Sequence, residues 1–391
     1  MRFKRFYAKY AFTLWVLVAV TVSMSHPSLF RSWFGTDLKV LIVPLIQIIT
    51  FGMGTTLSAR DFKNVIVMPG PVFIAVALHF FVMPLVGFTI AMTFGFPPEV
   101  AAGVILIGSV SSGVASNVMT YLAGGNVPLA VTITSASTLL SPLATPFWMK
   151  ILAGRLVPVD FVTMMLSILN MIIVPIIAGL VAHRLLYGAR ARAAREALTA
   201  VSAPAFLVLA GVAAATPVAW WGRLAVLRGG VLLGFLLLGS TALAKLAVRA
   251  LKGPANWMDK TLPVVSMAAI CLIIAVITAQ SRNELLTVGP LLILAAMLHN
   301  GLGYLFGYAG ARLARLDEGS CRAVAMEVGM QNGGMASGIA IDVLKSTSAA
   351  LAPAIFGPWM NVSGSLLAGW WRRRPVRPKP VSGAPEASVA S

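Results

Sequence analysis

Residues 326–339 read MEVGMQNGGMASGI and lie inside a long apolar segment near the carboxyl end of the chain. This stretch holds one carboxylate, Glu327, an adjacent amide pair and four glycines, and its nearest basic residue in the sequence is Arg322. A carboxylate at the centre of a bilayer costs about 2.5–3.5 kcal/mol on insertion scales. We therefore expect Glu327 to bind a cation, or alternatively to be protonated and hydrogen-bonded between helices.

The whole chain has the composition of a membrane protein. Of its 391 residues, 58% are hydrophobic and 11% are charged, whereas soluble domains carry about 25% charged residues. Apolar runs of about 20 residues, the length that crosses a bilayer as a helix, recur along the chain. The twelve predicted spans are 8–25, 37–58, 71–94, 98–123, 126–152, 157–186, 197–216, 224–248, 262–279, 287–311, 320–343 and 346–370.

The formal net charge of +18 comes from short basic clusters between these spans, around residues 184–195, 249–260 and 372–379. Such clusters follow the positive-inside rule, so the charge indicates membrane orientation and not nucleic-acid binding. Threading the chain through a bilayer with these clusters inside places both termini in the cytoplasm. We predict a multi-pass membrane protein, and a disordered cytoplasmic tail at 372–391 because that segment is rich in Pro, Ala and Ser.

An internal repeat relates the two halves. Leu78-His79 recurs as Leu298-His299, and the GVAS of 113–116 recurs as the GMAS of 334–337. The separations are 220 residues (299 − 79) and 221 residues (337 − 116), so the matches share nearly one register. The threading gives the two copies opposite orientations in the membrane, as in the inverted repeats of many secondary transporters.

Each half contains one span that is rich in Gly, Ser and Asn at its middle, at 108–118 and 327–338. Glycines favour unwinding, and unwound backbone at membrane depth is stable only where it is buried in protein or lines a cavity. Unwinding frees carbonyl oxygens for a cation, while the amino termini of half-helices attract anions. The oxygen atoms suited to sodium come from Ser116, Asn117, Thr134, Gln331, Glu327 and the carbonyls of Val328 and Met330.

These segments resemble the bile acid:sodium symporter family, and the chain is identified as a bacterial member. The resemblance rests on 51–63 (FGMGTTLSARDFK), 113–127, Thr134, 327–333 (EVGMQNG) and 361–370. It implies an all-α polytopic fold of two inverted five-helix repeats, with a panel domain, a core domain and crossing broken helices. The implied division is 1–186, then an insert at 187–260 with an extra pair of transmembrane helices, then 261–371.

The resemblance also implies two sodium sites and a substrate site at the crossing point. The first sodium site would use Ser116, Asn117, Thr134 and Glu327. The second would use Glu327, Val328, Met330 and Gln331, with His79 where relatives carry Gln. The substrate site would use Asn117, Asn332, Val114 and Met360.

Three departures from the family pattern change these expectations. Imidazole is a poorer sodium ligand than an amide oxygen, so His79 puts the second site in question and offers an alternative role as a proton carrier. Ala130 stands where relatives offer a Ser to the first site, which removes one oxygen. Val114 and Met360 are apolar where polar residues are familiar, so a bile acid is not assumed as the substrate.

We predict a sodium-coupled secondary transporter that imports a small or amphipathic organic anion by alternating access. It is not expected to be an enzyme, because no G-x-S-x-G or H-E-x-x-H motif is present, and it needs no cofactor beyond the coupling sodium. Its surroundings are the lipid bilayer; the sequence leaves the oligomeric state open, a monomer included. The alternatives are a proton-coupled transporter or exporter of the same fold, an intramembrane enzyme and a passive channel.

Overall fold

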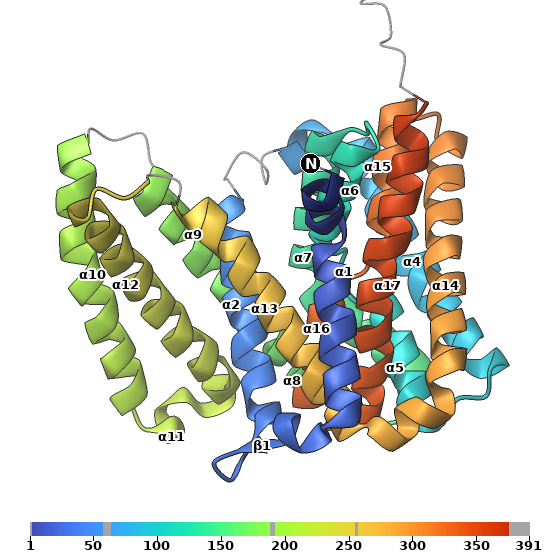
Figure 1. The fold of residues 1–391 in the computed structure, drawn as a ribbon, viewed down its shortest axis with the longest axis horizontal. Coiled ribbons are helices and arrows are strands. Elements are labelled where there is room, and N and C mark those ends of the chain that lie inside the picture. Colours follow the sequence, from blue (N-terminus) through green and yellow to red (C-terminus); the bar gives the residue numbers. More distant parts are fainter. Residues whose placement is uncertain (1, 58–63, 188–191, 255–256, 375–391) are drawn as a thin grey trace, which may run out of the picture.

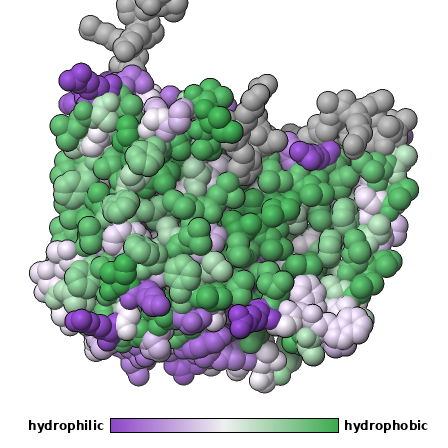
Figure 2. Space-filling view, turned by 180° about the vertical axis from the view of Figure 1, so that it is seen from behind, coloured by the Kyte–Doolittle hydropathy of each residue, from purple (hydrophilic) through white to green (hydrophobic). Residues whose placement is uncertain are grey.

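The chain folds into a bundle of tilted helices, and the computed structural model describes residues 2–57, 64–187, 192–254 and 257–374. Apolar residues cover the middle of the bundle as a broad belt, and hydrophilic residues gather toward its ends (Figure 2). Within the described residues, eight helices are long and apolar enough to cross a membrane. The protein is therefore a multi-pass membrane protein, as its composition predicts.

Helical segments coincide with each of the twelve predicted spans, although some spans are divided. A short hairpin of β1 (Ser32–Trp33) and β2 (Thr36–Asp37) joins the first two helices, flanked by the 3-10 turns η1 (Pro27–Phe30) and η2 (Leu38–Leu41). The helices of this part are α1 (Arg2–Ser25), α2 (Ile42–Thr56), α4 (Pro69–Thr93), α5 (Pro98–Ser109), α6 (Ala115–Leu122), α7 (Val127–Trp148) with its π-helical extension η3 (Met149–Ala153), α8 (Phe161–Ile168), the π-helical segment η4 (Leu169–Ile173) and α9 (Val174–Tyr187).

The rest of the chain continues with the insert and the second group of core helices. The predicted tail at 372–391 lies outside the described residues beyond residue 374. The elements are α10 (Arg192–Ala215), α11 (Val218–Trp221), η5 (Gly222–Leu227), α12 (Arg228–Ala250), α13 (Trp257–Gln280), α14 (Arg282–Leu313), α15 (Glu318–Gly329), α16 (Gly333–Asp342) and α17 (Thr347–Arg372).

Polar side chains fix where several of these helices begin. Asn126, Asp160, Asp317, Asn332 and Ser346 each precede a helix and accept a hydrogen bond from a backbone N–H in its first turn. Such N-caps satisfy donors that have no partner inside the helix, and each stabilises a helix by roughly 0.5–2 kcal/mol. The cap at Asn332 matters most here, because it starts α16 in the middle of a predicted span.

The two halves are related as inverted repeats. Helix α5 packs on α4 and α6 on α7, just as α15 packs on α14 and α16 on α17. Helices α4 and α14 lie against each other and run in opposite directions (Figure 1). Helix α1 begins and α17 ends at the same end of the bundle (Figure 1), which agrees with the expectation that both termini lie on one side of the membrane.

A second group of helices, α1, α2, α8, α9 and α13, packs together beside these core helices, and we call it the panel. Its two central helices approach closely at glycines: a Cβ on Gly54 of α2 would lie 2.4 Å from the carbonyl oxygen of Ile176 in α9. A larger residue at either Gly54 or Gly179 would separate the helices. The panel beside the core helices therefore has its two central helices packed closely together.

The insert contributes α10 and α12, which pack on each other at the outer edge of the bundle, and α12 also packs on α9 and α2 of the panel (Figure 1). The amide N–H of Gly230 in α12 donates to Asn170 Oδ1 in η4 at 2.7 Å. A Cβ at Gly230 would lie 2.4 Å from the same oxygen. The predicted additional helix pair is thus present, and it lies away from the crossing of the core helices.

Candidate functional site

The two broken spans cross in the middle of the bundle, and their unwound backbones pair with each other. The N–H of Gly113 donates to the carbonyl of Met330 at 3.0 Å, and the N–H of Asn332 donates to the carbonyl of Ser111 at 2.9 Å. Ser112 and Gln331 are opposite each other in this antiparallel bridge. Since lipid offers no partner for a free peptide group, the pairing explains how both breaks persist at this depth.

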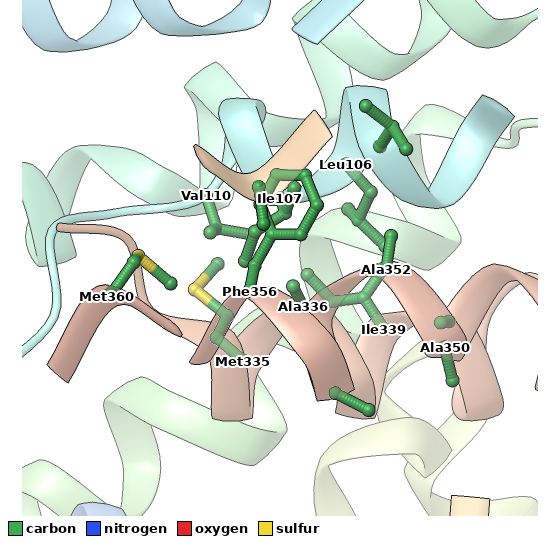
Figure 3. Packing of buried hydrophobic residues seen from close by; sticks show 14 of the residues in the cluster. Leu106, Ile107, Val110, Met335, Ala336, Ile339, Ala350, Ala352, Phe356 and Met360 are labelled. Atoms are coloured by element: carbon green, nitrogen blue, oxygen red, sulfur yellow. The ribbon is translucent and has the colours of Figure 1, made fainter. Parts of the chain in front are cut away.

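Gly113 is required for this close approach. A Cβ there would lie 2.7 Å from the carbonyl oxygen of Gln331, closer than an sp³ carbon and a backbone oxygen can pack. Apolar side chains of α5, α16 and α17 surround the crossing, and Figure 3 shows Val110, Met335, Phe356 and Met360 among them. The crossing is therefore rigidly packed on this side.

The carboxylate of Glu327 lies beside the crossing and is fully buried, with 0% exposure. Its Oε2 accepts hydrogen bonds from Ser112 Oγ at 2.6 Å and Thr134 Oγ1 at 2.7 Å. Its Oε1 accepts from Ser116 Oγ at 2.5 Å. Four segments, namely α15, the first break, α6 and α7, thus bring one carboxylate and three hydroxyls together.

Within the described part of the chain, no basic side chain forms an ion pair with Glu327. Arg322 on the same helix is engaged elsewhere: its Nε donates to Glu318 Oε1 at 2.8 Å and its Nη1 to the carbonyl of Ala123 at 2.8 Å. A buried charge needs a partner. The hydroxyl oxygens and the carboxylate form an oxygen-only cluster of the kind that hard cations prefer.

The residues predicted for the first sodium site are therefore brought together, with one exception and one addition. Among the described residues, Asn117 forms no hydrogen bond with Glu327. Its Oδ1 instead accepts from Thr134 Oγ1 at 3.3 Å, so Asn117 contacts the cluster through Thr134. Ser112 was not predicted, yet it contacts Glu327 directly. Its hydroxyl offsets the oxygen that Ala130 lacks, and the Ser-rich run at 108–118 was the only sequence signal for it.

The residues predicted for the second site contact the backbone of the two broken helices. His79 of α4 is fully buried, with Nδ1 3.1 Å from the carbonyl oxygen of Glu327 and Nε2 2.8 Å from that of Val110. The carbonyl of Val328 accepts from Gln331 Nε2 at 2.7 Å. His299, the repeat counterpart of His79, instead lies with Nε2 3.3 Å from the carbonyl of Met83.

A cavity of about 180 Å³ lies between the crossing and helices α2, α13 and α17. Of the four predicted substrate residues, Val114, Asn332 and Met360 line it and Asn117 does not. The first residues of α6 and α16 also line it, so two helix amino termini face the cavity. Helix amino termini carry partial positive charge and attract anions.

Gln331 also lines the cavity. Its side-chain oxygen Oε1 is buried and accepts no hydrogen bond from the described residues. The remaining lining is mostly apolar and includes no charged side chain. The cavity can therefore orient a small molecule through backbone amides and a few amide side chains, with apolar contacts around it.

Between the cavity and one end of the bundle, α16 closes against the panel. A Cβ on Gly338 would lie 2.6 Å from Ile46 Cδ1 and 2.8 Å from Met171 Sδ. Asp342, the last residue of α16, accepts a hydrogen bond from Ser167 of α8 through Oδ2 at 2.5 Å. Core and panel are thus in direct contact at this end, which the threading predicts to be the outer one.

The inverted repeats, the broken helices and the buried carboxylate define a membrane transporter with its site at a helix crossing. The family described as the sodium bile acid symporter family matches residues 43–219. A Bacillus subtilis protein described as the uncharacterized sodium-dependent transporter YocS is 34% identical over 368 residues, which cover 94% of this chain and 92% of that protein. The chain therefore belongs to this family, which is a family of sodium-dependent transporters.

Two further proteins are similar to this chain, one in sequence and one in structure. An Arabidopsis thaliana protein described as the probable chloroplastic sodium/metabolite cotransporter BASS1 is 26% identical, with 93% of this chain and 73% of that protein covered. The solved structure of the sodium proton antiporter MjNhaP1 from Methanocaldococcus jannaschii matches with a TM-score of 0.53 at 14% identity, covering 94% of this chain and 92% of that one. The second likeness concerns the fold alone, and it agrees with the predicted all-α, two-repeat architecture.

Proposed function

We propose that this protein couples the inward movement of sodium to the import of a small organic anion by alternating access across a bacterial inner membrane. The observation that carries the proposal is the buried Glu327 carboxylate, which three hydroxyls surround at the crossing of two broken helices. A sodium ion there would neutralise the carboxylate. Ser112, Ser116 and Thr134 would offer it their hydroxyl oxygens, with Asn117 nearby.

The neighbouring cavity supports an anionic substrate. Two helix amino termini face it and no charged side chain lines it, so the anion would be held by backbone amides, as the half-helices of other transporters hold substrate carboxylates. Its volume of about 180 Å³ lies below the roughly 300–1,000 Å³ of drug-sized pockets. We therefore favour a small acid over a large amphipathic one.

The proposed coupling of cation binding to anion binding depends on one stretch of backbone that contacts both sites. The break that carries Met330 and Gln331 contacts the cation cluster through Glu327 on one side and the cavity on the other. Cation binding removes the uncompensated charge next to the cavity and fixes the break that orients the anion. The sodium gradient would drive the anion inward, and a membrane potential of 100 mV adds about 2.3 kcal/mol only for each net positive charge that enters with the pair. The core helices would move against the panel and so expose the site to one side of the membrane at a time.

The direct test is uptake by purified protein reconstituted in liposomes, with a panel of labelled small acids and with sodium and pH gradients imposed separately. We expect accumulation of at least one acid to follow the inward sodium gradient and to vanish when potassium replaces sodium. Uptake that ignores external sodium contradicts the proposal.

A proton-coupled transporter or exporter of the same fold is the second candidate, because His79 lies against the carbonyl of Glu327. In that case the pH gradient alone drives flux and sodium has no effect, so the same experiment separates the two candidates. A passive channel would conduct without saturation or accumulation.

A further inference from the structure

We infer that this transporter binds one coupling sodium per cycle, and that the imidazole of His79 occupies the place where a second cation would bind. The inference rests on the proposed function, since it assumes that Glu327 holds the first sodium. It concerns the four predicted ligands of the second site: Glu327, Val328, Met330 and Gln331.

Two of the carbonyl oxygens that a second cation needs accept hydrogen bonds from the protein, and the third lies against the ring of His79. The ring of His79 lies at hydrogen-bond distance from that of Glu327, at 3.1 Å. Gln331 Nε2 donates to that of Val328 at 2.7 Å, and the N–H of Gly113 donates to that of Met330 at 3.0 Å. A carbonyl oxygen that accepts one hydrogen bond keeps a second lone pair, so a cation would have to approach these oxygens from the side that the donors and the ring of His79 leave open.

His79 is also fixed in this position. Its ring is fully buried and lies between the carbonyl oxygens of Glu327 and Val110, one from each broken helix. Moving the ring aside would remove its contact with both carbonyls at once. The side chain therefore connects α4 to the crossing and fills the space beside Glu327 with carbon and nitrogen, neither of which is a sodium ligand here.

One acceptor remains in this region, Gln331 Oε1, which has no partner among the described residues. A single amide oxygen does not make a site for a hard cation, which takes several oxygen ligands. The cluster at the side chain of Glu327 differs in this respect, because it combines two carboxylate oxygens with the hydroxyls of Ser112, Ser116 and Thr134. The side chain of Glu327 and its backbone carbonyl beside His79 thus have unequal capacity for sodium.

One sodium and a monovalent anion carry no net charge together. Import of a monovalent acid would then be driven by the sodium gradient and would be independent of the membrane potential, whereas two sodium ions would make it potential-dependent.

Replacing His79 by Gln would supply an amide oxygen to the vacated space and remove the ring from the carbonyl of Glu327. The second site would then become available.

The experiment counts ions directly and needs no knowledge of the substrate. Purified full-length protein is titrated with radioactive sodium in detergent, and bound ions per chain and the Hill coefficient are measured. We expect one ion per chain with a coefficient of about 1 for the wild type, and for His79→Gln two ions with a coefficient above 1, since the coefficient cannot exceed the number of sites.

His299→Gln is the matched control, because His299 is an equally buried histidine at the repeat-related position whose ring contacts Met83 and not Glu327. It should still bind one ion. Two ions on the wild type overturn the inference and leave the proposed function intact, whereas no bound ion on the wild type overturns the proposed function itself. A folded His79→Gln protein that still binds one ion overturns the role of His79; if that variant does not fold, His79→Asn replaces it and the wild-type count still decides the number of sites.

Discussion

Replacing Glu327 by Gln should remove sodium binding while keeping the shape of the site. The side chain keeps its length, and the hydroxyls of Ser112, Ser116 and Thr134, which now donate to the carboxylate, can rotate to accept from the new amide. What is lost is the negative charge. Because no basic side chain of the described residues pairs with Glu327, no buried cation of the protein is left behind.

The size of the effect follows from Coulomb's law. A sodium ion about 3 Å from the carboxylate, in surroundings with an effective dielectric constant of about 20, is attracted by roughly 5 kcal/mol. An amide oxygen retains only a part of this attraction. Since each 1.4 kcal/mol changes an affinity about tenfold, we expect the sodium affinity of Glu327→Gln to fall by about a thousandfold or more.

The assay is thermal unfolding of the purified protein in sodium chloride against the same concentration of potassium chloride. A ligand at about 100 times its dissociation constant stabilises the folded state by about 2.7 kcal/mol. A thousandfold weaker variant at the same sodium concentration would gain about 0.1 kcal/mol or less. In potassium chloride the variant should be at least as stable as the wild type, because it buries no charge.

Glu284→Gln is the control, because Glu284 is exposed in the first turn of α14, far along the chain from the crossing. It should keep the full sodium-specific stabilisation. If Glu327→Gln keeps that stabilisation as well, Glu327 is not the sodium ligand, and the coupling mechanism proposed for this protein is wrong.

Three further predictions follow from the same contacts. Ser112→Ala removes a hydroxyl that contacts the carboxylate and should weaken sodium binding by roughly tenfold to a hundredfold, as loss of a hydrogen bond to a charged group does; an unchanged binding isotherm would exclude Ser112 from the site. Gly113→Ala places a Cβ 2.7 Å from the carbonyl of Gln331 and should abolish transport, whereas Gly301→Ala, with no atom within 4 Å, should transport normally. Asp317→Ala removes the N-cap of α15, where Asp317 Oδ1 accepts from the N–H of Ser320, and should lower the free energy of unfolding by about 0.5–2 kcal/mol without changing sodium affinity.

Much of the fold could be predicted from local patterns. Apolar runs of membrane-spanning length located the helices, and the Gly-rich centres at 108–118 and 327–338 located the two breaks, which the structure places at residues 110–114 and 330–332. The insert helices were also visible as apolar runs, although Pro204 and Lys245 interrupt them. These features depend on residues close together in the chain, so the sequence shows them directly.

The contacts of the site were harder to predict from the sequence, as the serines at the first break show. Ser109, the last residue of α5, donates to the carbonyl of Ile105 within its own helix, and Ser111 donates to the sulfur of Met335, so of these three serines Ser112 alone reaches Glu327. In a regular helix the faces of these residues would follow from their spacing. Unwinding removes that periodicity, so the direction of each side chain depends on the course of the broken backbone.

The sequence by itself determined that this chain spans a membrane repeatedly, that its helices break at two places, and that an acidic residue, Glu327, lies in a long apolar segment. The tertiary structure alone decided which oxygens surround Glu327, that Asn117 stays one contact away, and that His79 lies against the backbone on the other side. The physical reason is distance along the chain: the contacts of Glu327 with Ser112, Ser116 and Thr134 join residues 215, 211 and 193 positions apart. The pairing of the two unwound segments, together with the packing of α15 on α6 and α7, brings these residues together.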